Sequence, residues 1–257
     1  MSNSKALFLH GGPGLHAAVE RAWFGDLLPV LWWDQPAIAA GDPAPFRTLV
    51  DHAARQLRTI ADANNGQVDL VAHSFGGQIA AALAKEQPAY ISRITLLGCG
   101  NPILQFFNLG KWQLGGEYEH PELQNAIAAA QEKCDESRFF SLAQACFPER
   151  RRPDFYFGPD SSAAQERYFA LASSAPPLDI STFFSVMRDM LLAPPLPQIN
   201  DFAGNVTVFL GKHDPLLQLD EDMERWRRIF PQSQFRIVNA GHIPHLELPP
   251  EMWFYHA

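Results

Sequence analysis

A serine placed between a buried strand and a helix is the feature of this sequence that most restricts its fold. The stretch from Gln67 to Ala82 reads QVDLVAHSFGGQIAAA, with an apolar run before Ser74 and small residues after it. A sharp strand-to-helix turn strains the backbone at its central residue, so the residues two before and two after it must be small. Here they are Ala72 and Gly76. The pattern indicates a reactive serine, and an ordinary turn with a solvent-facing serine is the alternative.

Length and charge favour one large core and argue against nucleic acid as a partner. A chain of 257 residues with 47% hydrophobic content is long enough for one α/β core and a small subdomain. Its 20 basic and 28 acidic residues give a net charge of 20 − 28 = −8. Phosphate backbones need clustered Lys and Arg, and the one basic cluster, Arg150 to Arg152, is short enough to be a solvated loop.

Cysteine usage and hydropathy point to a cytoplasmic protein. Cys99, Cys134 and Cys146 are too few and too widely spaced for a disulfide framework or a zinc site, which indicates a reducing compartment. No run approaches the roughly 18 apolar residues of a membrane span, and the N-terminus has no secretory cleavage pattern. We therefore expect no membrane contact, no cofactor and no metal.

Strand and helix patterns alternate along the chain and predict a doubly wound, mostly parallel sheet. A strand is expected before Ser74, and five more are expected at Ala6–Leu9, Pro29–Asp34, Ile91–Gly98, Asn205–Gly211 and Gln234–Val238. Helical spacing is found in Pro45–Asn64 and Glu221–Ile229. Ligands of such sheets bind beyond the carboxyl ends of the strands, so function is expected at that edge.

The segment between the fourth and fifth strands is about a hundred residues long, far beyond a normal connection. We expect a core domain formed by residues 1–100 and 201–257, and a helical lid formed by residues 101–200. Helices are expected within Pro121–Phe147, where Leu123, Ile127, Ala130 and Cys134 share one face, and at Ser162–Ser173 and Leu178–Leu192. The lid aromatics either shape an apolar pocket or fill the lid's own core; they are Phe106, Phe107, Trp112, Phe139, Phe140, Phe183 and Phe184.

A nucleophilic serine needs a histidine to take its proton and an acid to hold that histidine in the right tautomer. After the insertion, Asp214 follows the fifth strand and His242 follows the sixth, which gives the order Ser, Asp, His. Asp220 and Asp222 are rival acids, but they lie at the start of a helix, where acidic residues commonly serve as caps. His245 is the rival base. His73 and His213 are expected to orient loops or fill space.

These motifs resemble the α/β-hydrolase fold superfamily over almost the whole chain, nearest its proline iminopeptidase-like branch. The resemblance rests on His10-Gly11-Gly12-Pro13-Gly14, Ala72-His73-Ser74-Phe75-Gly76-Gly77, Gly211-Lys212-His213-Asp214-Pro215 and Gly241-His242 with Pro244-His245-Leu246-Glu247. It implies Ser74 as nucleophile, His242 as base and Asp214 as acid. It also implies an oxyanion hole formed by the backbone amides of Gly12 and Phe75.

The match to the iminopeptidase branch then breaks. Trp33-Asp34-Gln35 fits the branch, but Pro36 and Ala37 stand where Arg and Gly are usual, and His73 replaces the usual glycine before the serine. An aminopeptidase also needs a carboxylate in the lid for the substrate's amino group. The candidates are Glu117, Glu119, Glu122 and Glu166, each of which is more simply a solvated surface charge.

The start of the chain departs from the family pattern as well. The full fold has two strands before the one that feeds the oxyanion loop, whereas five residues precede Ala6. The strand carrying Trp32 and Trp33 is therefore expected at a sheet edge, shielded by a loop, by the lid or by a second subunit in a homodimer.

Taken together, the residues predict a cofactor-independent serine hydrolase that acts on a small carboxylic ester, thioester or amide through an acyl-enzyme. A proline iminopeptidase-like aminopeptidase is one alternative. The same triad also serves non-hydrolytic lyases and synthases, and the fold serves as a ligand receptor. A small acyl compound is the expected partner in each catalytic case.

Overall fold

A computed structural model describes residues 4–64, 66–115, 120–147, 154–193, 196, 198–199 and 201–255. Its centre is one sheet of parallel strands in the order β2-β1-β3-β4-β5-β6. The strands are β1 (Ala6–Leu9), β2 (Val30–Trp33), β3 (Val68–His73), β4 (Ile91–Leu97), β5 (Asn205–Gly211) and β6 (Gln234–Val238). The predicted parallel sheet is confirmed, and each expected strand is present.

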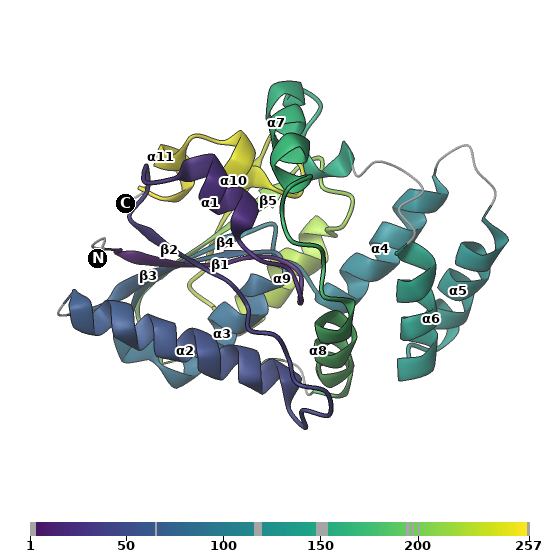
Figure 1. Ribbon diagram of the computed structural model, residues 1–257, viewed down its shortest axis with the longest axis horizontal. Coiled ribbons are helices and arrows are strands. Elements are labelled where there is room, and N and C mark those ends of the chain that lie inside the picture. Colours follow the sequence, from purple (N-terminus) through teal and green to yellow (C-terminus); the bar gives the residue numbers. More distant parts are fainter. Residues whose placement is uncertain are drawn as a thin grey trace.

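Helices cover both faces of the sheet (Figure 1). On one face lie α2 (Pro45–Ala63), α3 (Gly76–Glu86), α8 (Ile180–Leu192) and α9 (Leu219–Ile229). On the other lie α1 (Ala18–Phe24), α7 (Ser162–Ala172), α10 (Pro244–Glu247) and α11 (Pro250–Trp253). Hydrophobic periodicity does not predict α1, α10 and α11, because these helices are too short to show a helical repeat of apolar residues. Short 3-10 turns occur at Pro88–Tyr90 and Asp154–Tyr156.

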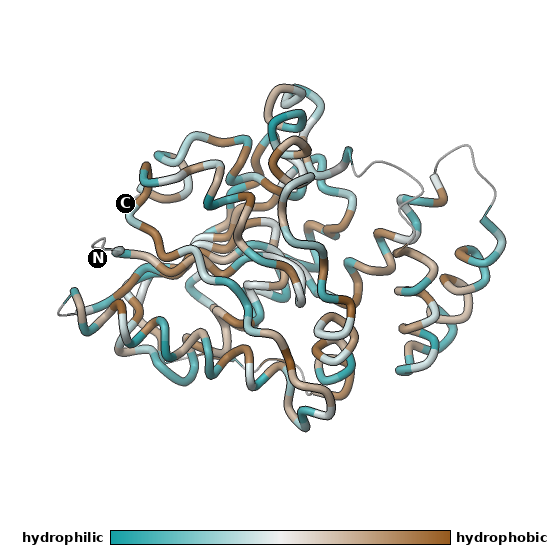
Figure 2. The backbone as a smooth tube through the Cα atoms, in the orientation of Figure 1, coloured by the Kyte–Doolittle hydropathy of each residue, from teal (hydrophilic) through white to brown (hydrophobic). Residues whose placement is uncertain are grey.

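The two hydrophobic layers follow from the alternation of side chains along each strand. In β1, which is buried throughout, Leu7 and Leu9 face the α2 and α3 layer, while Ala6 and Phe8 face the α1 and α11 layer. Helix α2 is strongly amphipathic, and Figure 2 shows brown and teal residues alternating along its tube. No helix in the described part of the chain has the length and apolar character needed to cross a membrane.

β2 is an edge strand, as predicted, and helices α1 and α2 cover its tryptophans. Trp33 is 2% exposed and donates its indole N–H to Nδ1 of His52 on α2, at 2.7 Å. Trp32 stacks on Phe24 of α1. The guanidinium of Arg21, also on α1, donates to the Trp32 carbonyl oxygen. These side chains are shielded within one chain, and the homodimer stays a prediction.

Five α-helices in the described residues separate β4 from β5: α4 (Pro102–Leu114), α5 (Pro121–Glu132), α6 (Glu136–Cys146), α7 and α8. Helices α4, α5 and α6 pack around a cluster of their own, which includes Phe107, Leu123 and Leu142. They stand beside the sheet in Figure 1, whereas α8 contacts α2 and α7 contacts α1. The division into a core and a lid stays a prediction.

The expectation that Cys134 shares one helical face with Leu123, Ile127 and Ala130 was wrong. Helix α5 ends at Glu132, Lys133 is extended, and Cys134 is exposed. A new helix then begins because the Asp135 carboxylate accepts a hydrogen bond from the Arg138 amide and caps α6. The apolar spacing in the sequence runs past the end of α5, and the Asp135 cap marks where the next helix begins.

Candidate active site

Ser74 lies on a tight turn between β3 and α3. It has a φ of 51°, and no other non-glycine residue in the described part of the chain has positive φ. Its amide donates to the Leu97 carbonyl oxygen of β4 at 3.0 Å. A Cβ on Gly76 would overlap the backbone of Leu9 and His10 in and after β1. The strain at Ser74 is therefore held by close backbone packing on both sides.

This packing gives a stability prediction. We expect Gly76→Ala to lower the free energy of unfolding by about 1–3 kcal/mol or more, because the added methyl forces β1 away from the turn. Gly66→Ala is the matched control, since a Cβ there meets no atom within 4 Å. Urea unfolding of both variants measures the difference. An equal loss in the two variants would contradict the packing argument.

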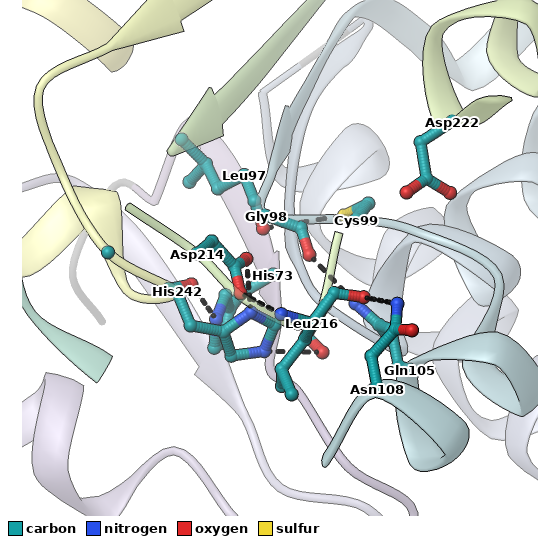
Figure 3. A network of polar contacts seen from close by, with 12 residues as sticks. His73, Leu97, Gly98, Cys99, Gln105, Asn108, Asp214, Leu216, Asp222 and His242 are labelled. Atoms are coloured by element: carbon teal, nitrogen blue, oxygen red, sulfur yellow. Dashed lines mark hydrogen bonds and ion pairs between the residues drawn. The ribbon is translucent and has the colours of Figure 1, made fainter. Parts of the chain in front are cut away.

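The structure brings Ser74, His242 and Asp214 together at the carboxyl edge of the sheet, and Figure 3 shows His242 beside Asp214. Nε2 of His242 lies 3.0 Å from Oγ of Ser74, and its Nδ1 lies 2.7 Å from Oδ2 of Asp214. All three side chains are buried. The other carboxylate oxygen of Asp214 accepts a hydrogen bond from the Leu216 amide at 2.9 Å. The Asp214 carboxylate is thus oriented by its own loop.

The rival acids and bases take other partners. Nε2 of His245 faces Glu20 at 3.4 Å, and the exposed His213 pairs with Asn239. The Asp222 carboxylate accepts hydrogen bonds from the amide of Asn101, just before α4, and from the amide of Gln218, just before α9. In the described residues none of these side chains bonds to Ser74.

A cavity of about 400 Å³ opens at Ser74, and its wall is mainly apolar. Among the expected lid aromatics, Phe106, Trp112 and Phe183 line it. Phe107 and Phe139 are instead buried in clusters between the inserted helices, where Phe140 and Phe184 also pack. Both expectations for these residues are therefore partly met.

Of the carboxylates expected to meet an amino group, the two that the structure describes do not line this cavity. Glu122 and Glu166 are exposed and do not line it. Glu117, Glu119 and the basic cluster Arg150 to Arg152 lie outside the described residues. Among the described residues, the carboxylate that lines the cavity is Glu20 of α1, which no sequence motif indicated.

A sequence model of the alpha/beta hydrolase fold matches residues 7–249, which is most of the chain. The chain belongs to the α/β-hydrolase fold family. Family membership agrees with the turn at Ser74, with the parallel sheet and with the order of the strand-end residues. A comparison with curated protein sequences found no significant match.

Solved structures of this family share the fold at low sequence identity. A proline iminopeptidase-related protein from Thermus thermophilus has a TM-score of 0.63 and 20% identity, covering 98% of this chain and 87% of that one. A thermophilic esterase from Thermogutta terrifontis has a TM-score of 0.57 and 20% identity, with coverages of 96% and 85%. The enol-lactonase of Burkholderia xenovorans has a TM-score of 0.53 and 15% identity, with coverages of 94% and 86%. At these identities the likeness shows the fold alone.

In this α/β-hydrolase, Gln35 clamps the glycine-rich loop from the side. Its Oε1 accepts from the Gly14 amide, and its Nε2 donates to the Gly12 carbonyl oxygen, both at 3.0 Å. The Asp179 amide, at the start of α8, donates to the Gly14 carbonyl oxygen at 2.9 Å. The loop is therefore held by a strand-end glutamine and by the insertion. Sequence reasoning used Gln35 only as part of a family motif and missed this role.

The loop that carries His242 is also held from both sides. His73 donates Nε2–H to the His242 carbonyl oxygen at 3.0 Å. Glu247 accepts from the Gly241 amide and, through its other oxygen, from the Gly158 amide of the insertion, both at 2.7 Å. The segment Pro244 to Glu247 was recognised as a motif, but no residue pattern indicated which backbone amides its carboxylate would bind.

Helix α4 is anchored to the strand ends by two amide side chains, which Figure 3 shows beside the Asp214 loop. Gln105 donates to the Gly98 carbonyl oxygen at 3.3 Å, and Asn108 donates to the Leu216 carbonyl oxygen at 2.9 Å. Because the Leu216 amide bonds to Asp214, α4 is linked to Asp214 by one residue.

Proposed function

We propose that this protein is a serine hydrolase that cleaves a small carboxylic ester, thioester or amide through an acyl-enzyme. The observation that carries the proposal is the hydrogen-bonded chain from Ser74 through His242 to the buried Asp214, set in a cavity wall. A serine hydroxyl is a poor nucleophile unless a base takes its proton as the new bond forms. The arrangement provides that base and fixes its tautomer.

In the proposed reaction, Oγ of Ser74 bonds to the substrate carbonyl carbon while its proton passes to Nε2 of His242. The carbonyl electron pair moves to oxygen and then returns, breaking the bond to the leaving group, which departs with the proton from His242. Water then gives a proton to His242 and attacks the acyl group. Ser74 regains its proton as the acid is released.

The amides of Gly12 and Phe75 are proposed to bind the developing oxyanion. Both residues line the cavity, and neither amide donates a hydrogen bond to any other residue that the structure describes. Donors that are fixed before the reaction stabilise developing charge without reorganising. The hydrogen bond from Gln35 to the Gly12 carbonyl oxygen fixes the position of the Gly12 backbone in this site.

The clamp gives a kinetic prediction. We expect Gln35→Leu to lower kcat for ester hydrolysis roughly 10- to 100-fold, because a small misplacement of a catalytic donor costs that much. Gln35→Glu keeps the acceptor for the Gly14 amide and should lose less. Steady-state kinetics on a short p-nitrophenyl ester, with thermal unfolding as a folding check, measures both. Unchanged kcat in Gln35→Leu would remove the positioning role.

The size and lining of the cavity favour a small, mainly apolar acyl group. A volume of about 400 Å³ is near the lower end of ligand pockets, and aromatic walls such as Phe106 and Phe183 bind carbon rather than charge. We further propose that residues 101–200 act as the lid that shapes this pocket.

A proline iminopeptidase-like aminopeptidase is the second candidate. It is favoured by the His10 to Gly14 motif and by the likeness to the proline iminopeptidase-related protein of Thermus thermophilus. It is disfavoured by the exposure of Glu122 and Glu166, which leaves no described lid carboxylate in the cavity. Direct comparison of ester and aminoacyl-amide substrates separates the two candidates.

The test is a fluorophosphonate probe combined with a substrate panel of p-nitrophenyl esters of increasing length, acyl thioesters and L-prolyl-p-nitroanilide. We expect one probe per chain, mapped to Ser74 by peptide mass spectrometry, and fastest turnover of a short ester or thioester. Preference for the prolyl amide would favour the aminopeptidase. Labelling of Ser74 without turnover of any substrate would favour a ligand receptor or a non-hydrolytic enzyme, and labelling elsewhere would refute the mechanism.

A further inference from the structure

A second cluster of side chains that offer ligand atoms lies next to the glycine-rich loop, where a Cβ on Gly11 would meet the His73 ring. Glu20 of α1, His73 at the end of β3 and His245 of α10 each present one ligand atom, and these three atoms lie within 4.8 Å of one another. All three residues are buried, His245 completely. Glu20 and His245 have no contact with Ser74 in the proposed mechanism, so that mechanism does not explain the cluster.

The hydrogen bonds within this cluster do not satisfy all of its acceptor atoms. His73 uses Nε2–H on the His242 carbonyl oxygen, so its Nδ1 carries a lone pair. Nε2 of His245 is 3.4 Å from Oε1 of Glu20, longer than the roughly 2.7–2.9 Å of a good charge-assisted bond. Nδ1 of His245 has no partner in the described part of the chain, so no hydrogen bond from outside the cluster fixes the proton of this ring, and Nε2 can present its lone pair to the cluster. Such a set suits a bound cation.

The charges agree with this interpretation. The described residues place no Lys or Arg in an ion pair with Glu20, whose only such partner is His245. A carboxylate whose described charged partner is an imidazole, beside a second imidazole, is a donor set that accepts a divalent metal ion in place of a shared proton.

We propose that Glu20, His73 and His245 form a binding site for zinc or a similar divalent transition metal ion. Two histidines and one carboxylate are a common zinc donor set, with a water as fourth ligand. Tetrahedral coordination needs ligand atoms about 3.4 Å apart, so small side-chain shifts close the cluster around the ion. The bond from His73 to a backbone carbonyl is the kind of outer contact that orients a metal-bound imidazole.

The cavity gives a metal ion access to the cluster, and a bound ion would stabilise the surrounding fold. Glu20 and His73 both line the cavity, so a hydrated ion reaches the cluster from the same opening as a substrate. A metal there ties α1 and α10 to the end of β3, three elements far apart in sequence. Its role is to stabilise the fold around the His242 loop, and by mass action it raises the melting temperature with metal concentration.

The experiment uses full-length protein without an affinity tag, stripped of metal by chelation and dialysis. Isothermal titration with ZnCl₂ should show one site per chain, and elemental analysis after gel filtration should find one bound zinc. Glu20→Gln and His245→Ala should each weaken zinc binding at least about 100-fold, because each removes one of three protein ligands. His213→Ala removes an exposed histidine outside the cluster and should bind as the wild type does.

Two controls keep the result decisive. Glu20→Gln preserves side-chain volume, so it carries the test if His245→Ala fails to fold, and Co²⁺ absorption reports four-coordinate geometry directly. Absence of zinc binding in the wild type would overturn the proposal, as would binding undiminished in Glu20→Gln. Because the readout is metal binding and not turnover, neither result bears on Ser74 as the nucleophile.

Discussion

Replacing Ser74 with alanine is expected to lower kcat for ester hydrolysis by roughly 10⁴- to 10⁶-fold and to abolish fluorophosphonate labelling. Without Oγ no acyl-enzyme forms, and what remains is the modest effect of the oxyanion donors and of substrate binding. Alanine keeps the Cβ that serine has at this positive φ, so it adds no new backbone strain. The fold should therefore survive the change.

Steady-state kinetics, active-site titration and urea unfolding of Ser74→Ala measure these effects together. Ser141→Ala is a matched control, since it removes an exposed hydroxyl on α6 that bonds within its own helix. It should retain wild-type kcat. Turnover by Ser74→Ala above about one per cent of wild type would exclude the covalent mechanism.

Asp214→Asn is expected to lower kcat by about 10⁴-fold while leaving the shape of the site intact. The carboxylate accepts a 2.7 Å hydrogen bond from Nδ1 of His242, which keeps Nε2 free to take the serine proton. An amide that donates toward Nδ1 selects the opposite tautomer, so Nε2 carries a proton and no longer acts as base. The amide oxygen still accepts from Leu216, and the loop keeps its position.

Comparison with Asp220→Asn separates this effect from general loss of negative charge, because Asp220 is the exposed rival acid at the start of α9. Asp220→Asn should keep kcat within about twofold of wild type. Equal losses in the two variants, measured on the same ester, would show that Asp214 is not the acid. Thermal unfolding checks that both proteins are folded.

Much of the fold followed from local patterns. The six strands were predicted because each is a short apolar run bounded by turn residues, and a parallel sheet follows from the helices between them. The turn at Ser74 was predicted because its strain allows only small neighbours, and Gly76 does abut the backbone of Leu9. The prediction failed at Cys134, where a helix cap broke an apolar spacing that looked continuous.

The covering of the sheet edge was not predictable in the same way. The sequence placed Trp32 and Trp33 at an edge but left three kinds of cover open. The structure uses α1 and α2, through Phe24, Arg21 and His52. The short helix α1 has no periodic signal, so its position beside β2 becomes visible only when the chain is folded.

By itself the sequence determined which side chains end at the carboxyl edge of the sheet. Parallel strands end at one edge, so Ser74, Asp214 and His242 had to lie near one another, whatever the details of packing. Only the tertiary structure decided their hydrogen bonds, the Gln35 clamp and the meeting of Glu20 with His245. These last contacts join residues far apart in sequence, and they depend on how side chains of separate elements approach, which no local spacing records.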